Sequence, residues 1–213
     1  MTTRRLTTAV AILGLAGTAA LASAPAASAH SGSHSSTGTR SLATVLAQDG
    51  AGFDRNWNDF DIVDNAVTAV LTAKPGSAVG VLADGKVALT AFLPTDRAFR
   101  HLASDLTGQR YQSESAVFAA VASLGIDTVE AVLLYHLVPG ATVTYRQALR
   151  SDGAALTTAS GGTVTVDVVC RYLVQLQDAD PDDRNPWVVK RDINKGNLQI
   201  AHGISEVLRP LDL

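Results

Sequence analysis

Cysteine, basic residues and catalytic motifs are all scarce in this sequence. It contains one cysteine, and its 17 basic residues fall short of 20 acidic ones and form no basic block. The lone cysteine excludes an internal disulfide and a Cys-x-x-Cys metal site, so a folded domain must be stabilised by its core. Apolar neighbours such as Val168 and Val169 predict that Cys170 is a small core residue rather than a reactive thiol. The absence of a basic block argues against nucleic acid as a partner.

Long hydrophobic runs are missing except near the N-terminus. Arg4 and Arg5 precede an apolar stretch from Ala9 to Leu21, and Ala27-Ser28-Ala29 offers the small residues that signal peptidase requires. This arrangement predicts a signal peptide over residues 1–29. After its removal no segment approaches the length of a membrane span, so we expect a secreted, extracellular protein.

Catalytic signatures are missing too. The sequence has no G-x-S-x-G elbow, no H-E-x-x-H zinc motif, no GxxxxGK[ST] loop and no GxGxxG fingerprint. We therefore expect a protein that is not an enzyme, with no catalytic residues, no cofactor and no metal. Serine, histidine and aspartate are all present, so a secreted hydrolase with an unfamiliar triad is kept as a third interpretation.

The rest of the chain divides into a tether and one domain. Residues 30–41 contain no apolar side chain and predict a flexible Ser/Gly/His tether, followed by a single domain over residues 42–213. Helices come early and strands late without regular alternation, which indicates an α+β fold. Helical spacing predicts helices over 59–71, 95–107, 115–124 and 127–137, and apolar or alternating runs predict strands over 87–93, 163–168, 188–189 and 198–208.

An acidic run near the C-terminal end resembles the opening of a calcium loop. In the run Asp178–Asp183 alternate carboxylates are present, but Asp183 stands where such a loop needs glycine. Val189 also occupies the position of the closing glutamate. A solvated acidic loop is therefore expected.

Two further patterns leave alternatives open. The aromatic residues Phe53, Trp57 and Phe60 could stack on sugars or cap the core. His136 follows Val129 by seven residues and lies on the inward face of its helix. A histidine there most often satisfies a backbone group in the core, with a ligand role as the alternative.

Four ordered segments carry a resemblance to a known family. They are Thr90–Phe99 (TAFLPTDRAF), Leu133–Gly140 (LLYHLVPG), Asp192-Ile193 and Ile200–Pro210. The first is similar to the fasciclin signature T-V-F-A-P-T-[DN]-x-A-F, and the chain resembles a secreted bacterial fasciclin-like (fasciclin I) domain over roughly residues 42–213. The resemblance implies a wedge of two β-sheets with an associated helical bundle, in which both signatures are adjacent central strands.

The same resemblance implies adhesion, meaning non-catalytic binding to a cell-surface or extracellular-matrix protein or polysaccharide. In animal members the tyrosine-histidine and aspartate-isoleucine segments are linked to integrin binding, which makes Tyr135, His136, Asp192 and Ile193 the matching interaction candidates. An extracellular carrier of a small apolar ligand, suggested by some relatives, is the alternative function. The sequence leaves the oligomeric state open.

The chain departs from the family pattern in three places. Ser205 replaces an aspartate that is common in the second signature, and the segment Gln175–Trp187 is longer than usual. Leu42–Phe60 adds an aromatic-rich beginning to the domain. Loops on a rigid scaffold can vary without disturbing the core, so we expect partner specificity in the last two segments.

Overall fold

The computed structural model describes residues 37–48, 50 and 52–210. The predicted signal peptide, and the predicted tether up to residue 36, lie outside the described residues. Residues 37–41 do not behave as the predicted tether, because the Gly38 N–H donates to the Gly196 carbonyl at 2.7 Å and Arg40 Nε donates to Asn194 Oδ1 at 2.7 Å. Contacts divide the chain into units of residues 1–35 and 36–213, and every element below belongs to the second unit.

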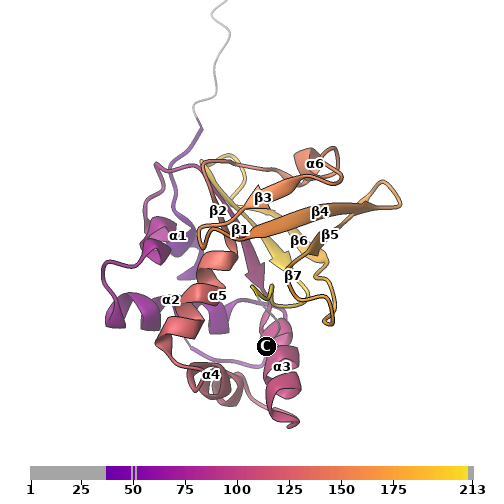
Figure 1. Ribbon diagram of the computed structural model, residues 1–213. Helices are drawn as coiled ribbons and strands as arrows, with labels where there is room; N and C mark the ends of the chain where they lie inside the picture. Colours follow the sequence, from indigo (N-terminus) through magenta and orange to yellow (C-terminus); the bar gives the residue numbers. More distant parts are fainter. Residues whose placement is uncertain (1–36, 49, 51, 211–213) are drawn as a thin grey trace, which may run out of the picture. The chain divides into compact units, whose positions relative to one another are not determined.

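Helices occupy the first half of the described chain (Figure 1). The helix over Asp96–Thr107 begins where the Thr95 hydroxyl accepts a hydrogen bond from the Ala98 N–H, and it ends at Gly108 with a φ of 67°. Both ends agree with the sequence prediction. The helices are α1 (Leu42–Leu46), α2 (Asp61–Ala73), the 3-10 helix η1 (Ala78–Ala83), α3 (Asp96–Thr107), α4 (Glu114–Ala122), α5 (Ile126–Tyr135) and α6 (Tyr145–Ala148).

Strands dominate the second half and form two sheets. A four-stranded sheet has the order β2-β1-β7-β6, and a three-stranded sheet has the order β3-β4-β5. β1 and β7 are parallel neighbours, with Phe92 opposite His202. This pairing confirms that the two signature strands are adjacent and central. The strands are β1 (Leu89–Pro94), β2 (Leu137–Pro139), β3 (Ala155–Thr157), β4 (Thr163–Val169), β5 (Leu173–Gln177), β6 (Val188–Ile193) and β7 (Gln199–Ile204).

Strand β1 separates two apolar cores. Its side chains alternate, so that Leu89, Ala91 and Leu93 join the helical core while Phe92 joins the core of the other side. That second core contains Val164 from the three-stranded sheet. All six residues of β1 are buried, which explains why its run is apolar except for Thr90, whose hydroxyl donates to the Ala141 carbonyl at 2.8 Å. The predicted α+β fold of two sheets and a helical bundle is confirmed (Figure 1).

The prediction for Cys170 is wrong. The residue is exposed and has a φ of 54°, in the turn that joins β4 to β5. The pairing of Val169 with Leu173 ends the ladder there, so the next residue enters a left-handed turn and leaves the core. Apolar neighbours in sequence therefore did not carry the cysteine inward.

Within the described ranges, no single helix is long and apolar enough to cross a membrane. The pair α4 and α5 passes the length and composition test together, but the two helices are bent by 105°. Buried residues of both helices, among them Val117 and Leu133, belong to the helical core.

Candidate functional site

Tyr135 and His136 lie inside the fold. Tyr135 is 1% exposed and its hydroxyl donates to the Thr163 carbonyl at 2.7 Å. His136 is 3% exposed, with Nδ1 2.7 Å from the Val132 carbonyl and Nε2 accepting from the Leu208 N–H at 2.9 Å. These partners require a neutral ring that carries its proton on Nδ1. The expectation that His136 satisfies backbone groups in the core is confirmed.

Asp192 and Ile193 end strand β6. Asp192 has a φ of 53°, and its Oδ1 accepts from the N–H of Tyr145 at 2.7 Å, at the first residue of α6. Its own N–H donates to Nδ1 of His202 at 3.2 Å. Ile193 packs against the helical core. Asp192 thus joins β6, β7 and α6.

The four candidate residues do not form one site. Tyr135 and His136 connect α5 to the second sheet and to the C-terminal segment, whereas Asp192 connects the end of β6 to α6. Each pair has structural contacts that account for its burial. Their role in binding a partner, which the resemblance implies, stays a prediction.

The aromatic residues before α2 pack on the protein. The Phe53 and Phe118 rings lie 5.4 Å apart, the Arg100 guanidinium lies 4.3 Å from the Trp57 ring, and the Lys190 ammonium lies 4.8 Å from the Phe60 ring. All three aromatic residues before α2 are partly buried against the helical core. Of the two alternatives, core capping is the one with observed contacts.

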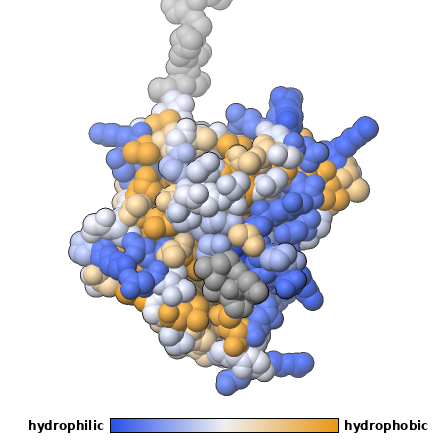
Figure 2. Space-filling view, viewed as in Figure 1, coloured by the Kyte–Doolittle hydropathy of each residue, from blue (hydrophilic) through white to orange (hydrophobic). Residues whose placement is uncertain are grey.

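A polar cleft of about 470 Å³ lies between α3 and the acidic segment. From α3 it is lined by His101, Ser104 and Asp105, which are three and four residues apart and share a helix face. Figure 2 shows hydrophilic side chains gathered over the region of β4 to β6, while the helical side is mixed. The remaining lining residues are Asp180, Asp182, Asp183, Arg184, Glu206 and Arg209.

Arg209 organises this cleft. Its Nη2 lies 2.9 Å from Asp105 Oδ2 and its Nη1 lies 3.5 Å from Asp180 Oδ2. Nε lies 2.9 Å from Asp183 Oδ2, an ion pair without an aligned hydrogen bond. The Arg209 N–H also donates to Asp178 Oδ2 at 2.7 Å. One guanidinium therefore joins the C-terminal segment to α3 and to the acidic segment.

These contacts correct the expectation of a solvated acidic loop in part, because Ala179, Pro181 and Asp182 are exposed whereas Asp180 and Asp183 are not. The side chain of Asp180 is 2% exposed and that of Asp183 is 16% exposed. Burial raises the pKa of Asp178, although N–H groups of Arg209 and Asp180 oppose that shift. The loop folds inward because an arginine outside the run supplies the counter-charge.

A second charged pair lines the cleft. His101 Nδ1 lies 2.9 Å from Glu206 Oε2, across 105 positions of sequence. Burial raises the pKa of Glu206, and His101 opposes that rise. The lining combines five carboxylates with two guanidinium groups, so its field favours positively charged or hydroxyl-rich partners.

The histidines give no support to the hydrolase interpretation. In the described part of the chain His101 contacts Glu206, His136 contacts backbone groups, and His202 contacts the Asp192 N–H and the Val143 carbonyl. A serine nucleophile needs a histidine within hydrogen-bonding reach. None of these three rings has a serine hydroxyl as its hydrogen-bond partner.

The apolar hollows are small. One beside Leu46 and Phe60 measures about 180 Å³, and one beside Ala66 and Phe118 about 100 Å³. Two others, in the second core and among the helices, measure about 10 and 20 Å³. Pockets that enclose a small ligand usually measure roughly 300–1,000 Å³. The packing of these regions therefore does not favour a carrier.

The protein is an α+β domain with a polar cleft on its surface. The family model of the Fasciclin domain matches residues 64–210. The chain belongs to this family, whose domains are adhesion-associated modules. The matched range starts later than the roughly 42–213 inferred from the motifs.

Solved structures give the same fold. Fourteen chains match, among them one described as a FAS1 domain pair from the insect cell adhesion molecule fasciclin I. The TM-score is 0.50 at 16% identity, and the match covers 71% of this chain and 48% of that chain. The chain thus spans about half the length of that domain pair. A comparison with curated proteins gives no match.

Sequence reasoning missed the residues that shape the cleft. Arg209 lies inside the second signature segment, where it was assigned only to the fold. Helical spacing gives His101 no partner, because Glu206 is 105 positions away in sequence. Carboxylates that could ligate a metal gather elsewhere, in the loop before α2 and at the starts of α2, α3 and α4, and no single sequence motif connects these separate segments.

Proposed function

We propose that the protein is a secreted, non-catalytic adhesion module that binds a cell-surface or matrix component. The predicted signal peptide, the predicted tether and the single domain over residues 42–213 belong to this proposal. The observation that carries it is the polar cleft around Arg209. It is built partly from the segment Gln175–Trp187, which we expect to be longer than usual for the family.

The cleft supports a particular kind of contact. Asp180 and Asp183 lie 3.5 and 2.9 Å from the Arg209 guanidinium, and these ion pairs hold the wall in place. Asp182 and Arg184 line the same cleft and are exposed. Exposed carboxylates on a rigid wall suit a positively charged segment of a surface protein or a hydroxyl-rich polysaccharide. Ser205 accepts a hydrogen bond from the Trp187 N–H at 2.9 Å, which fixes the end of the loop.

The test is binding of the purified protein to envelope and matrix fractions. We expect saturable binding that the double variant Asp182→Asn with Arg184→Gln weakens. Asp167→Asn with Arg150→Gln, both outside the cleft, removes the same two charges and is the control. If neither fraction retains the protein, the adhesion proposal fails. If the cleft variant and the control bind as well as the wild type, the contact lies elsewhere on the surface.

A further inference from the structure

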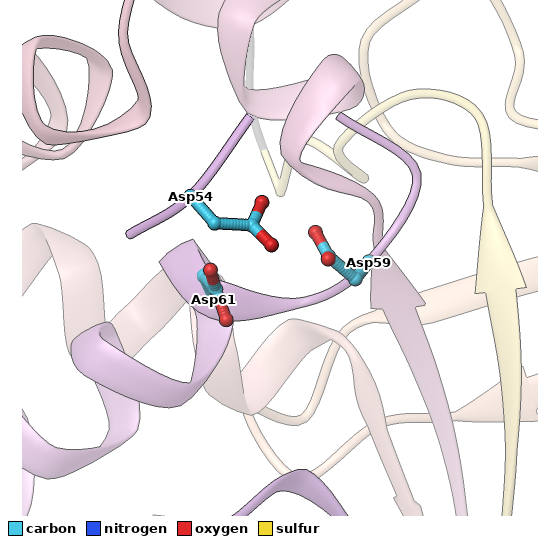
Figure 3. A group of neighbouring side chains, drawn as sticks. All are labelled: Asp54, Asp59 and Asp61. Carbon is cyan, nitrogen blue, oxygen red and sulfur yellow. The ribbon is translucent and has the colours of Figure 1, made fainter. Parts of the chain in front are cut away.

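Three helices of the described fold begin near one point, and each begins with a carboxylate. α2 starts at Asp61, α3 at Asp96 and α4 at Glu114. Oxygens of Asp54, Asp59 and Asp61 all lie within 4.8 Å of one another (Figure 3), and so do oxygens of Asp59, Asp96 and Glu114. We call these five residues the carboxylate cluster, in which Asp59 is common to both groups.

Main-chain N–H groups orient the carboxylates. Asp96 Oδ1 accepts from the Ile62 N–H at 2.9 Å, and its Oδ2 accepts from the Asp61 N–H at 3.3 Å. Glu114 Oε2 accepts from the Asp54 N–H at 2.7 Å. Such bonds fix the direction of the carboxylates, as outer-shell bonds do around metal ligands.

Two buried oxygens of the carboxylate cluster receive no such bond. Among the described residues, Asp59 Oδ1 and Glu114 Oε1 have no hydrogen-bond partner, and these residues are 3% and 0% exposed. A buried carboxylate oxygen without a partner costs folding free energy. In Figure 3 the carboxylates of Asp54 and Asp59 face one another. A cation beside Asp59 Oδ1 and Glu114 Oε1 would supply the partner that these two oxygens lack.

Among the described residues, no lysine, arginine or histidine forms an ion pair with Asp59 or Glu114. Lys74, His101, Lys195 and Arg209 instead pair with acids outside the carboxylate cluster. Burial, together with the hydrogen bond to Asp59, raises the pKa of Asp96 to about 8. A shared proton is thus the competing way to reduce repulsion. A proton shared between Asp96 and Asp59 leaves Glu114 Oε1 without a partner.

We propose that the carboxylate cluster is a Ca²⁺ site. Its donors are all oxygen atoms, which suits a hard cation and not a metal that prefers nitrogen or sulfur ligands. Ca²⁺ accepts roughly six to eight oxygens in flexible geometry, whereas Mg²⁺ requires a near-ideal octahedron. The carboxylates come from one loop and from the starts of three helices, and Ca²⁺ accepts such an irregular arrangement more readily than Mg²⁺ does. Bound there, Ca²⁺ joins the loop before α2 to the N-terminal ends of α2, α3 and α4.

Calcium chloride titration of the full chain tests this proposal. Calorimetry should show saturable binding, and Tm should be higher in Ca²⁺ than in EDTA, with a smaller shift in MgCl₂. Asp59→Asn and Glu114→Gln should lower Ca²⁺ affinity by about tenfold or more. Because each variant removes a buried charge, its Tm in EDTA should equal or exceed that of the wild type. That second measurement separates lost binding from lost folding.

The acidic segment of the cleft is the competing location, and Asp182→Asn is the matched control. This variant should bind Ca²⁺ as the wild type does. Terbium(III), a luminescent substitute for Ca²⁺, emits when a nearby indole transfers energy to it. Trp57→Phe should remove that emission and Trp187→Phe should leave it unchanged. The proposal is overturned by the absence of any Ca²⁺-dependent heat or Tm shift, by loss of binding in Asp182→Asn, or by emission that depends on Trp187.

Discussion

The cleft and the carboxylate cluster hold the same residue types in different electrostatic settings. In the cleft, Asp105, Asp180 and Asp183 surround the Arg209 guanidinium. In the carboxylate cluster, Asp59 and Glu114 each keep a buried oxygen without a partner among the described residues. The comparison teaches that acidity alone does not define a cation site. What matters is whether the chain brings its own counter-charge to the carboxylates.

The largest expected effect comes from removing that counter-charge. Arg209→Met leaves the buried carboxylate of Asp180 without its cation, so the free energy of unfolding should fall by about 3–5 kcal/mol. Urea denaturation measures the loss. Arg209→Lys should recover only part of it, because one ammonium cannot reach three carboxylates as a guanidinium does. A loss below about 1 kcal/mol would mean that the ion pairs of Arg209 stabilise the fold no more than exposed ion pairs do.

The pH dependence of stability can compare the cleft with the carboxylate cluster only after the part that comes from His136 is separated. Burial lowers the pKa of His136 to about 4 from its ordinary 6.5. Between these values the unfolded chain binds a proton that the folded chain does not. Stability should therefore fall by about 3 kcal/mol as pH falls from 6.5 to 4, with no further loss from this group below pH 4.

Urea denaturation at several pH values measures this slope. His136→Gln should be less stable at neutral pH but should lose less stability between pH 6.5 and 4. If the variant and the wild type have equal slopes, the acid sensitivity arises from other groups.

A matched pair of substitutions tests the comparison directly by its sign. In EDTA, Asp59→Asn should raise the free energy of unfolding by about 1 kcal/mol, because it removes a buried charge that has no cation. Asp180→Asn should lower it by about 1–3 kcal/mol, because it removes the buried negative charge that faces Arg209. Thermal unfolding in the same buffer compares both variants. Changes of the same sign would mean that the two settings are not distinct.

The smallest expected effect concerns partner binding. Asp182→Asn alone should weaken binding to the retained fraction by about 0.5–1 kcal/mol, roughly two- to fivefold. The difference should shrink at high salt, because exposed charges are screened. Binding isotherms at low and high salt check both statements. An effect that is independent of salt would argue against a charge contact.

Much of the helical part was predictable from local pattern. The spacing of Val117 and Val121, or of Val129 and Leu133, predicts helices whose inward residues are indeed buried. Thr95 and Gly108 mark the ends of α3 because capping depends on residues within one turn. Short elements such as α1, α6 and β3 were missed, since three to five residues carry too little periodicity to indicate a structure.

The site was less predictable. The buried place of His136 followed from helical spacing, but its second partner, the Leu208 N–H, lies 72 positions away. The acidic run Asp178–Asp183 was visible, yet its partner Arg209 was assigned only to the fold. The interaction role of Tyr135, His136, Asp192 and Ile193 stays a prediction. Their contacts explain their burial without reference to a partner.

By itself the sequence determined the class of fold, the main helices and the central pair of strands, because periodicity, capping and the four motifs are local properties of the chain. Only the tertiary structure decided which charges meet. Asp59 approaches Glu114, and Asp105 approaches Arg209, after helices and sheet have packed. A carboxylate has no preferred partner along the chain, since its interaction depends on distance and burial in space. The carboxylates of the cleft therefore surround an arginine, and the carboxylate cluster keeps buried oxygens suited to a cation.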